Sequence, residues 1–264
     1  MKWRQIVPSI VTLTAMLAGF LSILLTFEGM RTGNRAYPYY LWSAQLIMIA
    51  MIFDGLDGNL ARMLNGKSEF GAELDTYVDL TAFGIAPAIL VFAVTFRNEG
   101  SPLLLRVLLP SAVALSGVVR LARFKVKDPD RGQSGYAGLP ITANAAWVAL
   151  FVLIGEATSA GSGRGVFSLK QGWFAALFLA GILVFIMLQV TNLRYPKPTK
   201  KAAIFIPCVV LVILLMLLKQ KWAALVAAVM ILLGLVYVGI GPLFVKGVEA
   251  HRARRESKMN GEND

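Results

Sequence analysis

The chain contains a single histidine, a single cysteine and few acidic residues for its length. The one histidine, His251, lies in the charged segment near the end, which rules out a His-cluster metal site and argues against Ser-His-Asp or paired-histidine chemistry. The one cysteine, Cys208, lies in an apolar run and has no partner for an internal disulfide. Because Asp and Glu together number only 15 of 264 residues, any place where they gather is informative.

Apolar residues dominate the chain, at 57% with a mean hydropathy of +0.66. Most of the uncharged runs approach the roughly 20 residues that a helix needs to span the hydrocarbon core of a membrane. We therefore expect an all-α polytopic membrane protein with about eight transmembrane helices, and we interpret the first as an uncleaved helix, not a signal peptide. The runs are 8–27, 36–53, 80–96, 107–119, 132–155, 171–193, 202–218 and 222–245.

The basic residues that give the net charge of +11 are unevenly distributed among the expected loops. If the N-terminus is cytoplasmic, 18 of the 26 Lys and Arg residues fall on the cytoplasmic side. The positive-inside rule then predicts that both termini are cytoplasmic and that the protein is integral to the cell (inner) membrane. The excess of Lys and Arg on the cytoplasmic side faces anionic lipids and does not indicate a nucleic-acid partner.

Four aspartates flank a short turn in the first third of the chain. Asp54 and Asp57 are three residues apart and Asp75 and Asp79 are four apart, so each pair shares one face of a helix. If the chain folds back at Gly66, Asp57 and Asp75 are equally distant from the turn and all four carboxylates converge. Such a cluster near a bilayer requires cations, because unpaired carboxylates there repel one another and lose their hydration.

The neighbours of the aspartates favour a site for a diphosphate. Oxygen ligands without His or Cys suit Mg²⁺, Mn²⁺ or Ca²⁺. Gly58, Ala61 and Gly71 leave space on the same faces, and Arg62 offers a planar fork for a phosphate. Ser68 is placed to cap the second helix of the hairpin, with an acidic residue following in its first turn.

Two other interpretations compete with an enzyme site. Small residues at helical spacing also serve ordinary helix packing in membranes, and an interfacial Asp is often only a solvated helix end. A cation transporter would also concentrate acids, but near the bilayer midplane and often on repeated, broken helices. We favour the enzyme because the acids straddle a turn at the cytoplasmic interface and no second half of the chain carries a matching set.

The aspartate hairpin resembles the motif of the CDP-alcohol phosphotransferase family at every defined position: D54-x2-D57-G58-x2-A61-R62-x8-G71-x3-D75-x3-D79. The resemblance implies a membrane-embedded helical enzyme that moves a phosphatidyl or similar group from a CDP-linked donor to an alcohol and releases CMP. It also suggests three regions: a six-helix family core in 1–200, an added helix pair in 201–245 and a charged cytoplasmic tail in 246–264.

The flanking segments resemble the phosphatidylserine synthase branch of that family, which implies CDP-diacylglycerol and L-serine as substrates. They are SEFGAELDTYVDLTAFGIAPA, RLARFKV and GLPITANAA. The chain departs from the branch at Ser9 and Ala15, where both asparagines of the first helix are missing, at Thr81 and Ala82, and at Lys125, which replaces an asparagine. Glycerol phosphate, an inositol phosphate or choline therefore stays open as the acceptor, and an ether lipid stays open as the donor.

The resemblance also assigns roles to residues. Asp54, Asp57, Asp75 and Asp79 would hold two Mg²⁺ or Mn²⁺ ions, with Ca²⁺ as a non-productive occupant, and Asp79 would also serve as the catalytic base. The expected CDP- and diphosphate-binding residues are Asp57, Gly58, Ala61, Arg62, Gly71 and Thr12.

A zwitterionic acceptor needs a cation for its carboxylate, and the basic residues at the end of the fourth expected helix are the candidates. They are Arg120, Arg123 and Lys125, whose alternative role is anchoring at the lipid headgroups. The other expected partners are membrane lipids and a second copy of the chain in a homodimer. The last two helices either mediate dimerisation or only embed the enzyme.

Overall fold

The computed structural model describes residues 3–33, 37–66, 68–95, 103–127, 136–159, 167–169, 172–196, 202–218 and 220–261. Two short strands, β1 (Tyr136–Ala137) and β2 (Arg194–Tyr195), pair antiparallel. All other regular elements in the described ranges are helices: α1 (Trp3–Thr32), α2 (Tyr37–Met63), α3 (Glu69–Val78), the π-helix η2 (Asp79–Ile85), α4 (Ala86–Thr95), α5 (Leu103–Lys127), α6 (Ile141–Ser159), α7 (Trp173–Val190), α8 (Ala202–Leu217) and α9 (Gln220–Gly261).

The structure confirms the expected all-α polytopic membrane fold. Because α3, η2 and α4 follow one another without a break, the described residues form eight helical rods. Seven of these rods are long and apolar enough to cross a membrane. The eighth, α8, has a shorter apolar stretch, Ile206–Leu217.

Two boundaries differ from the sequence-based expectation. The apolar run expected from residue 132 becomes helical only at Ile141, because Gly138 has a φ of +79° and Pro140 stands directly before the helix. At the other end of the chain, α9 continues to Gly261, so most of the segment expected as a charged tail belongs to a helix.

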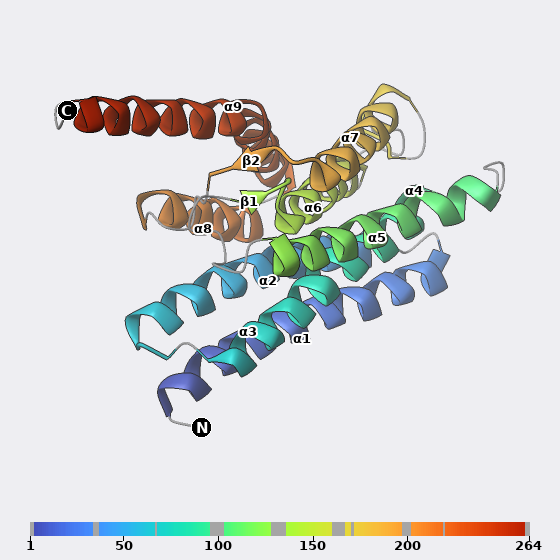
Figure 1. The fold of residues 1–264 in the computed structure, drawn as a ribbon. Helices are drawn as coiled ribbons and strands as arrows, with labels where there is room; N and C mark the ends of the chain where they lie inside the picture. Colours follow the sequence, from blue (N-terminus) through green and yellow to red (C-terminus); the bar gives the residue numbers. More distant parts are fainter. Residues whose placement is uncertain are drawn as a thin grey trace.

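The helix α6 is the centre of the bundle, with 72% of its apolar window buried, and it contacts α2, α7, α9 and η2. The pair α1 and α2 forms one side, where the Ser43 hydroxyl hydrogen-bonds the Ser22 hydroxyl at 2.8 Å and the Thr26 hydroxyl at 2.7 Å. Figure 1 shows both termini and the α2–α3 turn at the same end of the molecule.

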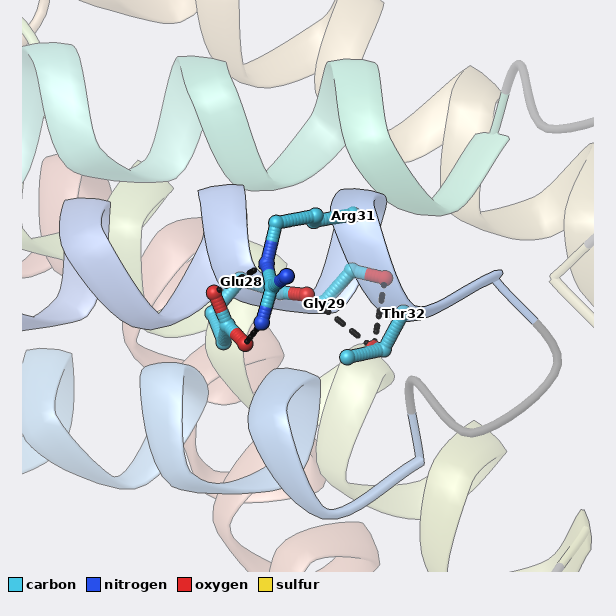
Figure 2. Close-up of polar contacts among 4 residues, drawn as sticks. All are labelled: Glu28, Gly29, Arg31 and Thr32. Carbon is cyan, nitrogen blue, oxygen red and sulfur yellow. Dashed lines mark hydrogen bonds and ion pairs between the residues drawn. The ribbon is translucent and has the colours of Figure 1, made fainter.

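The C-terminal end of α1 is stabilised by local polar contacts (Figure 2). Arg31 Nε donates to Glu28 Oε2 at 2.9 Å, and the Thr32 hydroxyl donates to the Glu28 carbonyl at 3.0 Å. Gly29 lies against the buried ring of Tyr40, where an added Cβ would come within 2.5 Å of a ring carbon. The first turn of α2 can therefore pack closely against the last turn of α1.

The added helix α9 packs against α6 and also contacts α8 and the strand β2. The Tyr237 hydroxyl donates to the Pro196 carbonyl at 2.8 Å, and the rings of Tyr237 and Tyr195 lie 5.8 Å apart. Only 6% of the apolar window Trp222–Leu243 is buried inside the chain. Most of this surface is therefore available to lipid or to another protein.

The contact between α1 and η2 yields a stability prediction. A Cβ at Gly19 would lie 2.6 Å from Ala82 Cα, which is backbone and cannot move aside. Gly19→Ala should therefore destabilise the protein by about 1–3 kcal/mol, the usual cost of overpacking. The melting temperature in detergent measures this, with Gly234→Ala in α9 as the control because a Cβ added there would meet nothing within 4 Å. Equal melting temperatures for the two variants would contradict the predicted close contact.

Candidate active site

The turn between α2 and α3 is built by a helix-ending motif at Asn65 and Gly66. Asn65 has a φ of +49°, a left-handed conformation that Asn tolerates better than most residues. Gly66 N donates to the Ala61 carbonyl at 2.9 Å and Asn65 N donates to the Arg62 carbonyl at 3.3 Å, the pattern of a Schellman C-cap. Gly66 itself is required for close approach, since its Cβ would lie 1.9 Å from the Arg4 carbonyl oxygen.

The start of α3 agrees with the sequence. Ser68 is the N-cap, and its hydroxyl accepts a hydrogen bond from Gly71 N at 3.0 Å. Glu69 follows in the first turn, where a negative charge is favoured by the helix dipole. The turn and the cap together fix how α3 folds back along α2.

Three carboxylates meet across this hairpin. Ligand oxygens of Asp54, Asp57 and Asp75 all lie within 4.8 Å of one another. Asp57 is 5% exposed, and its Oδ2 has no hydrogen-bond partner within the described part of the chain. A buried carboxylate oxygen without a donor, beside two further carboxylates, fits a divalent cation that prefers oxygen ligands. These three residues could therefore hold a metal ion.

The fourth predicted ligand, Asp79, is not among the three carboxylates whose oxygens all lie within 4.8 Å of one another. It begins the π-helix, and its Oδ2 is 3.9 Å from Nη1 of the buried Arg120 on α5. It remains close enough to Asp54, Asp57 and Asp75 for charge repulsion. A π-helical turn holds an extra residue, and such turns are frequent at functional sites. The sequence reasoning did not predict this irregular helix.

A cavity of ≈ 260 Å³ opens beside the carboxylates, between the hairpin and the first turns of α1. It is lined by all six residues that the sequence assigned to CDP and diphosphate binding, namely Thr12, Asp57, Gly58, Ala61, Arg62 and Gly71. The sequence reasoning missed Gln5, Pro8 and Ser9, which line the same cavity from α1. Their signal was the spacing of small and polar residues along one face of an apolar helix.

The three residues predicted to bind the acceptor have different surroundings. Only Arg120 reaches the aspartates, through Asp79. Arg123 donates to the Val190 carbonyl and, at 2.6 Å, to Asn192 Oδ1, which links α5 to the end of α7. Lys125, the residue that departs from the family pattern, pairs with Glu73 at 2.7 Å on the exposed side of α3.

The fold and the site define a class. Carboxylates, an arginine and a cavity meet at one end of a polytopic helical bundle, as in a membrane-embedded phosphotransferase. The family model for CDP-alcohol phosphatidyltransferase matches residues 5–170. The chain belongs to this family and is a membrane-embedded phosphatidyltransferase.

Several curated relatives are similar to the chain over long stretches. A CDP-diacylglycerol–serine O-phosphatidyltransferase of Helicobacter pylori is 29% identical over 190 residues, covering 72% of this chain and 71% of the relative. An enzyme of the same name from Saccharomyces cerevisiae is 38% identical over 146 residues, covering 52% of this chain and 50% of the relative. The archaetidylserine synthase of Methanothermobacter thermautotrophicus is 29% identical over 196 residues, covering 72% of this chain and 69% of the relative.

Two acidic residues on α3 provide a matched test of the metal site. Asp75 belongs to the carboxylate trio, whereas Glu73 pairs with Lys125 away from it. Asp75→Asn should weaken Mn²⁺ binding at least about 10-fold by removing a charged ligand, and Glu73→Gln should leave it within about threefold. The free Mn²⁺ signal in electron paramagnetic resonance, measured on metal-stripped protein, reports the affinity. Equal affinities for the two variants would exclude Asp75 as a ligand.

Proposed function

We propose that the protein transfers the phosphatidyl group of CDP-diacylglycerol to the hydroxyl of L-serine and releases CMP. The observation that carries the proposal is the meeting of the Asp54, Asp57 and Asp75 carboxylates beside a cavity that Asp57, Asp75 and Arg62 line. This arrangement suits a nucleoside diphosphate, because its two phosphates need both cations and a guanidinium. The names of the relatives support serine as the acceptor and CDP-diacylglycerol as the donor.

The carboxylate trio would hold one divalent ion, Mg²⁺ or Mn²⁺, and Asp79 is near enough to assist a second. The bound ions would neutralise the diphosphate and the departing CMP. Ca²⁺ has the same preference for oxygen ligands and would compete as a non-productive occupant. Gly58, Ala61 and Gly71 leave room for the nucleotide to approach the helix backbones, while Thr12 of α1 and Arg62 of α2 line the same cavity.

In the proposed reaction the serine hydroxyl oxygen forms a bond to the phosphorus that carries diacylglycerol. The bond between that phosphorus and the oxygen bridging to CMP breaks, and the electron pair leaves with CMP. The proton lost by the hydroxyl passes to Asp79, which acts as the general base. Nη1 of the buried Arg120 lies 3.9 Å from Asp79 Oδ2.

The orientation and assembly follow from the charge distribution and the fold. The site lies at the same end of the molecule as both termini (Figure 1), and we assign this end to the cytoplasmic face of the cell membrane on the positive-inside rule. The exposed apolar surface of α9 offers one face for the proposed homodimer. The region beyond residue 200 would then serve embedding and assembly.

The donor could also be an ether lipid, because one relative is named an archaetidylserine synthase. A divalent ion held by the carboxylate trio would bind the diphosphate of either donor. This alternative therefore leaves the chemistry at phosphorus and the proposed acceptor unchanged.

An acceptor panel tests the proposal directly. Purified protein is supplied with CDP-diacylglycerol and Mg²⁺ or Mn²⁺, and CMP release is measured with serine, glycerol phosphate, inositol phosphate or choline. We expect serine to give the fastest release and a phosphatidylserine product. Faster release with another acceptor would identify that acceptor in place of serine, and no release with any acceptor would overturn the proposed reaction.

The role of Asp79 is tested by replacing its carboxylate with the amide of asparagine. Asp79→Asn keeps the shape of the side chain but removes the proton acceptor, so kcat should fall at least about 100-fold. Mn²⁺ affinity should stay within about threefold if Asp79 is a base and not a principal ligand. Activity within a few-fold of wild type at saturating metal would show that Asp79 is neither, and Glu73→Gln serves as the control.

A further inference from the structure

The guanidinium of Arg62 is held by a neutral side chain of the same helix. Arg62 lies in the last turn of α2 and lines the cavity. Its Nη2 donates a hydrogen bond to Oδ1 of Asn59, one turn earlier in the helix, at 2.7 Å. Asn59 is not one of the residues that line the cavity, so it contacts Arg62 without narrowing the space beside the carboxylates.

The amide of Asn59 is oriented by a second hydrogen bond. Its Nδ2 donates to the carbonyl of Gly55 at 2.8 Å. A guanidinium can only donate and a carbonyl can only accept, so one orientation of the amide alone satisfies both bonds. Gly55, Asn59 and Arg62 are spaced i, i+4 and i+7, which places them on one face of α2. The backbone of the helix therefore fixes Oδ1 of Asn59 toward the arginine.

The neutral charge of this partner matters for phosphate binding. Among the described residues, the ion pairs join other groups, and none involves Arg62. A carboxylate partner would offset the positive charge of the guanidinium and compete with a phosphate for its N–H groups. An amide oxygen occupies one nitrogen and leaves the charge in place. Arg62 can therefore be held and still attract an anion.

Holding Arg62 before the ligand arrives favours binding. The arginine is exposed, and a long exposed side chain loses rotational freedom when it is fixed on a ligand. A hydrogen bond that already limits this freedom lowers the cost of binding. Asn is a poor helix former, so α2 itself gains little from Asn59. The contact with Arg62 is a physical reason for an asparagine at this position.

We propose that Asn59 is a positioning residue that holds the Arg62 guanidinium in place for a phosphate of the CDP-linked donor. This inference rests on the nucleotide-binding part of the proposed function. Asn59 acts through Arg62 and does not itself touch the substrate. It occupies one of the two positions that the family motif leaves undefined between Gly58 and Ala61.

The first test measures nucleotide binding when the amide is removed. Asn59→Ala should raise the Kd for CDP about fivefold, because Arg62 must then be ordered by the ligand alone. CDP carries both phosphates of the donor, and isothermal titration calorimetry on purified protein with saturating Mg²⁺ gives the Kd. The affinity for Mn²⁺, from the free Mn²⁺ signal in electron paramagnetic resonance, should stay within about twofold because the carboxylate trio is unchanged.

A second asparagine–arginine pair provides the matched control. Asn192 Oδ1 accepts from Arg123 at 2.6 Å, and neither residue lines the cavity. Asn192→Ala removes a hydrogen bond of the same kind, and the Kd for CDP should stay within about twofold. Equal losses of CDP affinity in the Asn59 and Asn192 variants would mean that both only loosen the fold, and the inference would be wrong.

A double variant separates positioning from a direct or purely structural role. Arg62→Ala removes the proposed phosphate contact, so adding Asn59→Ala to it should change the Kd for CDP by less than about 1.5-fold. Additive losses in the double variant would overturn the inference. If Asn59→Ala does not fold, Asn59→Leu replaces it, because leucine is close in size, makes no hydrogen bond and is a better helix former.

The results also separate the inference from the function on which it rests. If wild-type protein binds CDP and the Asn59 variants bind it equally well, the inference is wrong and the proposed function stands. If wild-type protein does not bind CDP in the presence of Mg²⁺, both are overturned. If CDP binds and the Asn59 variants lose affinity, but serine is not used, the inference stands and the proposed acceptor is wrong.

Discussion

The structure depends on bringing like charges together at the end of a membrane bundle. Asp54, Asp57, Asp75 and Asp79 repel one another, and the low dielectric around Asp57 makes that repulsion stronger than it would be in water. Arg120 offsets part of this charge through Asp79, and a bound cation would offset the rest. The carboxylates can be held at this distance only because the hairpin that carries them is fixed by neighbouring helices.

That support comes from places where backbones approach closely. Gly66 lets the hairpin turn pack on the carbonyl of Arg4, and Gly19 lets α1 pack on Ala82 of η2. The first helix therefore serves two purposes, since it closes the cavity with Ser9 and Thr12 and braces the π-helix that begins at Asp79. A larger side chain at either glycine would move the site as well as the helix.

The region beyond the matched family segment joins the bundle through α7. This helix ends beside α5, where Arg123 donates to the Val190 carbonyl and to Asn192 Oδ1 and so links the two helices. Residues outside 5–170 therefore help to hold α5, the helix that carries Arg120, in place.

The sequence alone determined the all-α membrane fold, the hairpin and the Ser68 cap, because hydrophobic length and helical spacing are local properties. The family resemblance added six of the residues that line the cavity. Only the tertiary structure decided the surroundings of Asp79, since they depend on a π-helix and on a contact with Arg120, 41 positions away in the chain.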